Sequence, residues 1–149
     1  MASELALHLE RVLPAAPSIV YRMQVEPEAL ARWWGPKGFS SPSVELDVRV
    51  GGDYRIVMQP PSGEAFVLGG VFREVEPVSR LAYTFRYEAP DVDDQETTVA
   101  ISLRTLGDST ALTIDQGTFA TEARLALHEQ GWTESLDRLR EQVEMRSGL

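Results

Sequence analysis

The side chains best suited to chemistry lie in the last third of the chain. His128 and Trp132 are four residues apart in a segment whose apolar residues recur every three or four positions. This spacing places both side chains on one face of a helix. A histidine can gain or lose a proton near neutral pH, and a buried indole N–H needs an acceptor. The pair allows two predictions. Either His128 is a polar group that forms a hydrogen bond with a ligand inside a cavity, or it is a core histidine whose hydrogen bond is made within the protein.

A catalytic role for His128 would need a substrate within reach and a group that orients the imidazole ring. The sequence identifies neither, so it assigns no catalytic residue and leaves His128 as a weak candidate. The second histidine, His8, alternates with Leu7 and Leu9 and is expected on the exposed face of a strand. With two histidines and no cysteine, we expect no metal site, and no motif implies a cofactor.

Carboxylates gather in the stretch EAPDVDDQE at residues 88–96, which contains Asp91, Asp93 and Asp94. Their spacing lacks the glycine and the distal glutamate of a calcium-binding EF-hand loop. We therefore expect a solvated acidic loop. The chain also has no GxSxG nucleophile motif, no phosphate-binding glycine loop and no HExxH zinc motif.

Two neighbouring tryptophans, Trp33 and Trp34, stand where a short helical pattern is stopped by Gly35-Pro36. Each indole can bury roughly 150–250 Å². The segment therefore predicts a short lid over an apolar interior. Either both rings pack the lid onto the core, or one of them, Trp34, lines the mouth of a cavity.

Length and composition narrow the class of protein. The chain has 149 residues, 43% of them hydrophobic, and is expected to form one domain over 1–149. Its net charge of -9 disfavours binding to nucleic acid or to anionic membranes. The start of the chain does not resemble a signal peptide, and no stretch is apolar enough to span a membrane. We expect a cytoplasmic protein without membrane insertion.

The spacing of hydrophobic residues along the chain predicts the strands and helices that would position these side chains. Alternation predicts a strand over 4–13 and a series of strands over 43–116, while Pro17 and Pro27 open two short helices. A period of three to four predicts one long amphipathic helix over 121–145. Short hairpins imply an antiparallel sheet. The order predicts an α+β fold in which a curved seven-stranded sheet wraps the C-terminal helix.

A helix about 10 Å wide cannot fill such a curved sheet from edge to edge. The remaining space must hold large side chains, the short helices or a ligand. We predict an internal cavity between sheet and helix that binds a small hydrophobic molecule, lipid-like or aromatic. The residues that we expect around the ligand are Trp34, Phe39, Met58, Phe85, Gln116, His128 and Trp132.

Four segments carry a family resemblance, and their order is more specific than any one of them. They are LARWWGPKGF, VGGDYRIVM, GGVFREVEPVSRLAYTF and HEQGWTESLDRL. Over residues 10–145 the chain resembles bacterial AHSA1-type (activator of Hsp90 ATPase homologue) members of the START/Bet v 1-like (SRPBCC) helix-grip superfamily. The resemblance implies a seven-stranded sheet that grips a C-terminal helix around an apolar cavity.

The resemblance leaves several functions open. Members of the superfamily bind lipids, sterols, hormones or polyketides, some are cyclases or other enzymes, and one branch activates the Hsp90 ATPase. The implied partners are a small hydrophobic molecule and an Hsp90 homologue, the latter in a co-chaperone or stress-response role. A cyclase or hydrolase activity in the same cavity is the enzymatic alternative. Either a monomer or a homodimer is compatible with the sequence.

Two departures from the family pattern bear on these functions. Full-length eukaryotic Hsp90 activators resemble this chain only in their C-terminal half, which weakens the co-chaperone interpretation. Gln116 stands where many bacterial relatives have a histidine near the end of the last strand. An acid–base role that this position has in relatives does not transfer to a glutamine.

Overall fold

The chain folds into a curved antiparallel sheet with a long helix across its concave side. The computed structural model describes residues 5–147. The predicted order of one strand, two short helices, six strands and a long helix is confirmed. The elements are β1 (Leu7–Leu13), α1 (Pro17–Val25), α2 (Pro27–Ala31), β2 (Ser40–Leu46), β3 (Asp53–Gln59), β4 (Phe66–Glu76), β5 (Arg80–Tyr87), β6 (Thr97–Leu106), β7 (Ser109–Gly117) and α3 (Glu122–Ser147).

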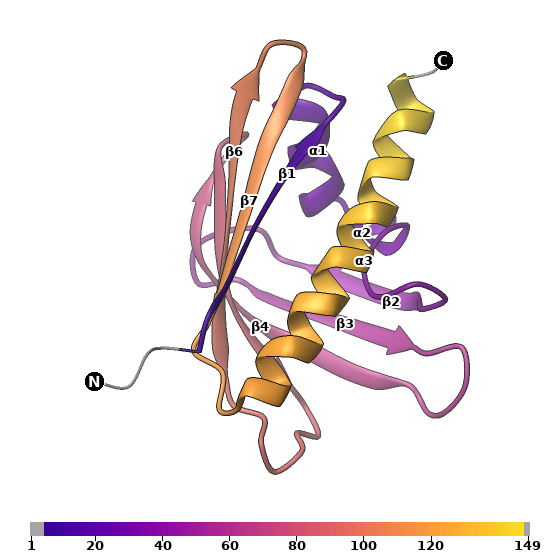
Figure 1. The fold of residues 1–149 in the computed structure, drawn as a ribbon, viewed down its shortest axis with the longest axis vertical. Coiled ribbons are helices and arrows are strands. Elements are labelled where there is room, and N and C mark those ends of the chain that lie inside the picture. The colour runs from indigo at the N-terminus through magenta and orange to yellow at the C-terminus, as the bar shows by residue number, and fades with distance from the viewer. Residues whose placement is uncertain (1–4, 148–149) are drawn as a thin grey trace.

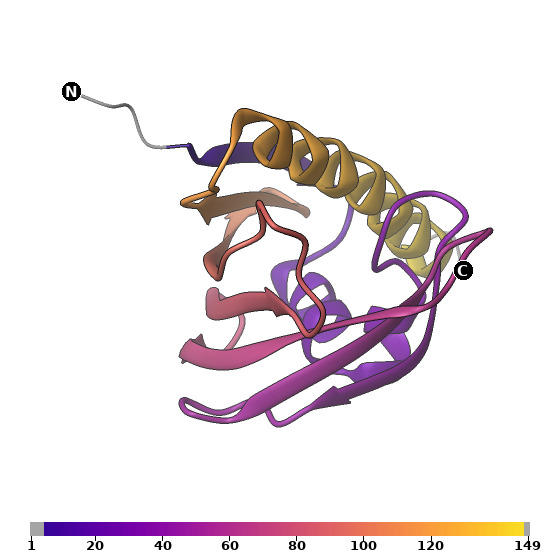
Figure 2. The ribbon, with the colours of Figure 1, turned by 90° about the horizontal axis from the view of Figure 1, so that it is seen from below.

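The seven strands form one sheet in the order β1-β7-β6-β5-β4-β3-β2, so β1 and β2 are its two edges. All neighbouring strands are antiparallel, as the hairpins predict. Figure 1 shows α3 running across the sheet, and Figure 2 shows the sheet curling so that α3 lies over its open side. The two short helices pack nearby, α1 against β6, β7 and α3, and α2 against β2.

Strands β4 and β5 approach each other closely at Gly70. A Cβ added at Gly70 would lie 2.0 Å from the carbonyl oxygen of Thr84, which no side chain can tolerate. The same carbonyl accepts a hydrogen bond of 2.6 Å from the Tyr54 hydroxyl. A strand glycine of this kind marks a place where another backbone segment comes close, so only glycine permits this approach of β4 and β5.

Helix α3 begins with a side-chain cap. The hydroxyl of Thr121 accepts the backbone N–H of Arg124 at 3.1 Å, which satisfies one of the unpaired donors of the first turn. The buried residues of α3 recur at helical spacing and face the sheet; they include Trp132, Leu136, Leu139 and Val143. None of the helices within residues 5–147 combines the length and the apolar character that a membrane span needs.

Candidate functional site

The lid segment, which we define as residues 33–39 (WWGPKGF), is fixed at both of its tryptophans. Trp33 is fully buried, and its Nε1 donates to the carbonyl oxygen of Met23 at 2.9 Å. The ring of Trp34 meets that of Trp132 edge-on, with centroids 5.3 Å apart. Trp33 therefore anchors the lid segment to α1, while Trp34 reaches α3.

Arg138 ties the lid segment to α3, and sequence reasoning missed it. Its Nη1 lies 2.9, 3.0 and 3.2 Å from the carbonyl oxygens of Trp34, Gly35 and Pro36. One turn earlier, a Glu134 carboxylate oxygen accepts the backbone N–H of Lys37 at 3.0 Å. These contacts join residues about a hundred positions apart, so no local pattern in the sequence marks them.

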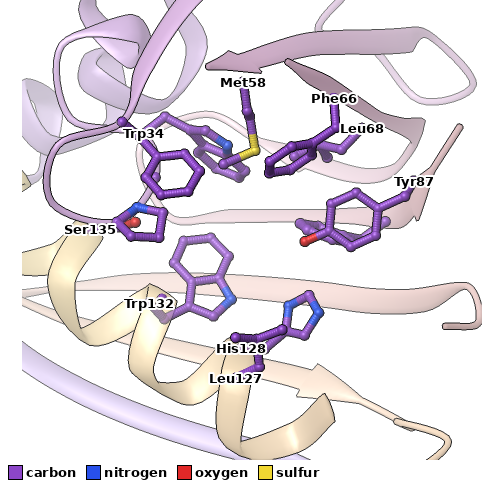
Figure 3. Close-up of a pocket in the computed structure, with 14 residues that line it drawn as sticks. Trp34, Met58, Phe66, Leu68, Tyr87, Leu127, His128, Trp132 and Ser135 are labelled. Atoms are coloured by element: carbon purple, nitrogen blue, oxygen red, sulfur yellow. The ribbon is translucent and has the colours of Figure 1, made fainter. Parts of the chain in front are cut away.

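A cavity of about 220 Å³ lies between the lid segment, the sheet and α3. Figure 3 shows Met58, Phe66 and Leu68 on strands facing Trp132 and His128 on α3. The walls of the cavity are mainly aromatic and aliphatic, and none of the lining residues is an acidic residue, a lysine or an arginine. The lining residues are Trp34, Gly35, Pro36, Phe39, Met58, Phe66, Leu68, Phe85, Tyr87, Leu127, His128, Gly131, Trp132 and Ser135.

Of the seven residues expected around a ligand, the structure brings six together in this lining: Trp34, Phe39, Met58, Phe85, His128 and Trp132. Gln116 is not among them. It is fully buried, its Oε1 accepts Trp132 Nε1 at 2.7 Å, and its Nε2 donates to Thr97 Oγ1 at 2.8 Å. Gln116 therefore holds the Trp132 ring in place and does not face the cavity.

The lining also contains side chains that the sequence analysis did not place around the ligand, chiefly Phe66, Tyr87 and Ser135. The spacing of residues in the sequence could have identified two of them as cavity-facing. Tyr87 follows Phe85 by two positions, so alternation in the strand puts both on one face. Ser135 follows His128 by seven positions, which is two turns on the same helix face. Phe66 begins its strand, where the pattern is too short to give a face.

His128 is packed among aromatic rings. Its ring centroid lies 4.9 Å from that of Phe119, 5.4 Å from that of Phe85 and 6.0 Å from that of Tyr87. Burial lowers the pKa of His128 to about 4, and burial raises the pKa of Tyr87 to about 12. Both groups are therefore uncharged at neutral pH, and the imidazole is a poor proton donor there.

The lowered pKa of His128 predicts a loss of stability in mild acid. The unfolded chain takes up a proton on this residue near pH 6.5, whereas the folded chain does so only near pH 4. Stability is therefore fully present above about pH 6.5 and falls as the pH drops toward about 4. Between about pH 7.5 and pH 5 we expect the loss to be about 2 kcal/mol.

The measurement is the free energy of unfolding in urea at both pH values, for the natural protein and for His128→Gln. Carboxylates and His8 also titrate in this range, but they are common to both proteins. The two proteins should therefore differ in how much stability they lose between the two pH values, and this difference measures the contribution of His128. Equal losses of stability in the two proteins would contradict a neutral, half-buried imidazole at this position.

The acidic loop between β5 and β6 is not simply solvated, which corrects our expectation. Arg124, in the first turn of α3, forms ion pairs with Asp91, Asp93 and Asp94. The Asp94 side chain is 9% exposed, and the guanidinium of Arg124 lowers the pKa of Asp93. The loop is thus fastened to α3. Within residues 5–147, no cluster of three or more histidine or acidic side chains is arranged to hold a metal ion.

Comparison with solved structures gives the same fold. A crystal structure of a protein from Chromobacterium violaceum is 33% identical, with a TM-score of 0.80 over 92% of this chain and 96% of that one. A protein from Nitrosomonas europaea is 30% identical over 100% of both chains, with a TM-score of 0.82. The AHSA1 protein from Silicibacter pomeroyi is 27% identical over 95% of this chain and 99% of its own, with a TM-score of 0.83.

A search among curated proteins found no match. The family described as Activator of Hsp90 ATPase homolog 1-like protein matches residues 14–144, which is most of the chain. The match spans the lid segment, every strand from β2 to β7 and nearly all of α3. The chain therefore belongs to the activator of Hsp90 ATPase homolog 1-like protein family.

Proposed function

We propose that the protein binds a small, mostly apolar molecule in the cavity between α3 and the sheet. The observation that carries this proposal is an uncharged, largely aromatic lining around about 220 Å³ of space. Sites for small molecules combine such walls with a few polar groups. Here these groups are His128, Tyr87 and Ser135.

The size of the cavity limits the ligand. An apolar cavity of about 150 Å³ in another protein binds benzene. By that comparison this cavity suits a molecule of about ten non-hydrogen atoms, such as a two-ring aromatic compound or a medium-length chain. Burial of apolar surface would contribute about 25 cal/mol per Å² before the costs of association.

The experiment uses Gly131, which lies on the α3 wall of the cavity. A Cβ at this position would meet only Pro36 Cγ, at 3.9 Å, so a side chain fits without a backbone clash. We expect Gly131→Leu to fill the cavity and abolish binding of naphthalene and of C8–C10 alcohols, as measured by calorimetry or ligand-observed NMR. Gly131→Ala is the matched control, because it adds one methyl group and should retain binding.

Both variants should stay folded, since replacing glycine inside a helix stabilises it by up to about 1 kcal/mol. Unfolding curves check this point. The proposal fails if the natural protein binds none of these probes, or if Gly131→Leu binds them as well as Gly131→Ala does.

Interaction with an Hsp90 homologue is the second candidate, and the family match is the observation that favours it. Such a contact would use the outer surface of the protein and not the cavity. We therefore expect Gly131→Leu to leave complex formation and any change in the chaperone's ATPase rate unaltered. The same variant thus separates the two candidate functions.

A further inference from the structure

The cavity has one distinctly polar end. Tyr87 on β5 and His128 on α3 both line it, and their ring centroids lie 6.0 Å apart. Ser135, the remaining polar side chain of the lining apart from the indoles, lies two helical turns further along α3, about 10 Å away. Figure 3 shows Tyr87 and His128 on one side of the close-up and Ser135 on the other, beside Trp34.

Neither polar group at this end is satisfied by the protein. Across residues 5–147, no backbone or side-chain group forms a hydrogen bond with the Tyr87 hydroxyl or with the His128 ring nitrogens, which instead lie among aromatic rings. Both side chains are half-buried, so in the free protein only water in the cavity can pair with these polar atoms. A ligand that supplies the missing partner therefore gains affinity at this end of the cavity.

The surroundings disfavour a charged ligand group here. Arg124, the cation whose charge acts on both Tyr87 and His128, is already engaged by Asp91, Asp93 and Asp94, so three carboxylates face one guanidinium. Asp94 and Arg124 also line a small hollow that includes Tyr87 and His128. A carboxylate or phosphate placed between Tyr87 and His128 would lose its water without gaining a free cation, and the excess negative charge of the loop would repel it.

We propose that the cavity selects an uncharged aromatic molecule that carries a hydroxyl group, and that this hydroxyl lies between Tyr87 and His128. The inference rests on the proposed ligand-binding function. A hydroxyl accepts a hydrogen bond from the Tyr87 O–H and donates one to the unprotonated ring nitrogen of His128, so one group serves both residues. The rings of Phe85 and Trp132 line the space beside it and suit an aromatic body.

The test compares three probes with the same two-ring body at neutral pH: naphthalene, 2-naphthol and the anion 2-naphthoate. We expect 2-naphthol to bind about tenfold more tightly than naphthalene, the gain typical of one or two neutral hydrogen bonds. We expect 2-naphthoate to bind at least about tenfold more weakly than 2-naphthol, because its charge stays unpaired. Tightest binding by naphthalene or by 2-naphthoate would overturn the proposal.

Tyr87→Phe keeps the aromatic wall and removes only the hydroxyl. It should bring the affinity for 2-naphthol close to that for naphthalene, and it should leave naphthalene binding unchanged. Tyr21→Phe is the matched control, because Tyr21 lies on α1 and does not line the cavity. Equal 2-naphthol affinities in the two variants would contradict the assigned position of the hydroxyl.

The outcomes also separate this inference from the proposed function. If neither the three probes nor the C8–C10 alcohols bind the natural protein, ligand binding itself fails. If a C8–C10 alcohol binds and none of the three probes does, only the inferred aromatic selectivity is wrong. If all three bind with equal affinity and Gly131→Leu abolishes binding, the cavity is a binding site and only the inferred selectivity is wrong.

Discussion

Replacing Trp33 with alanine is expected to lower the free energy of unfolding by about 3–5 kcal/mol, the range for truncating a large buried aromatic residue. Trp33 has no exposed surface, so its removal leaves a cavity that the surrounding core cannot fully close. It also removes the indole donor to the carbonyl of Met23 at 2.9 Å. Met23 lies in the last turn of α1, where carbonyl oxygens have no partner within the helix.

In urea denaturation this loss of stability is measured as a lower midpoint concentration of urea, while the slope of the unfolding free energy against urea concentration stays the same. Trp33→Phe separates the two contributions, because it keeps most of the volume and loses the hydrogen bond. Leu106→Ala is a control on an exposed apolar residue and should change stability by less than about 0.5 kcal/mol. A Trp33→Ala protein as stable as Leu106→Ala would show that the lid segment is not anchored to α1 in this way.

Gln116→Leu is expected to destabilise the fold by about 2–4 kcal/mol, although leucine is nearly the same size and more apolar. Gln116 is 1% exposed and is the hydrogen-bond partner of both Trp132 Nε1 and Thr97 Oγ1. Substitution leaves an indole N–H and a hydroxyl buried without partners. Each unsatisfied group costs about 1–3 kcal/mol.

The control for this variant is Gln130→Leu, an exposed glutamine on α3 whose amide donates a hydrogen bond to Glu134 at 3.1 Å. It should be nearly neutral in the same unfolding measurement. The double variant Gln116→Leu with Trp132→Phe removes donor and acceptor together, so it should be less destabilised than the sum of its parts. Additive losses would mean that the Gln116–Trp132 hydrogen bond contributes little to the fold.

The strands and the long helix of this fold are predictable from the sequence because hydrophobic residues recur every second position in a strand and every three or four positions in a helix. Alternation identifies β1, β3 and β5, and the three-to-four period identifies α3 to within two residues at either end. Antiparallel order follows from the hairpins, and the need to cover one apolar face places α3 against the sheet. The cavity is expected for the same reason, since one helix cannot fill a curved sheet.

The contacts that organise the cavity are less predictable, because they join distant positions. Alternation puts Gln116 on the concave face, but only the packing of α3 against β7 decides that Trp132 covers it. Arg138 shows the same limit, since its long side chain reaches carbonyl oxygens over a hundred residues earlier. Arg124 holds the acidic loop of residues 88–96 against α3 by a similar long-range contact, where the sequence predicts a solvated loop.

The two edge strands of the sheet, β1 and β2, carry residues that bear on whether further strands can be added to it. An unpaired edge strand presents free N–H and C=O groups that can template strand addition and aggregation. On β1 the exposed positions are His8, Glu10 and Val12, two of which are polar or charged, and on β2 the exposed Pro42 offers no N–H at all. Charged and proline residues at edges oppose such growth, so both ends of the sheet discourage polymerisation.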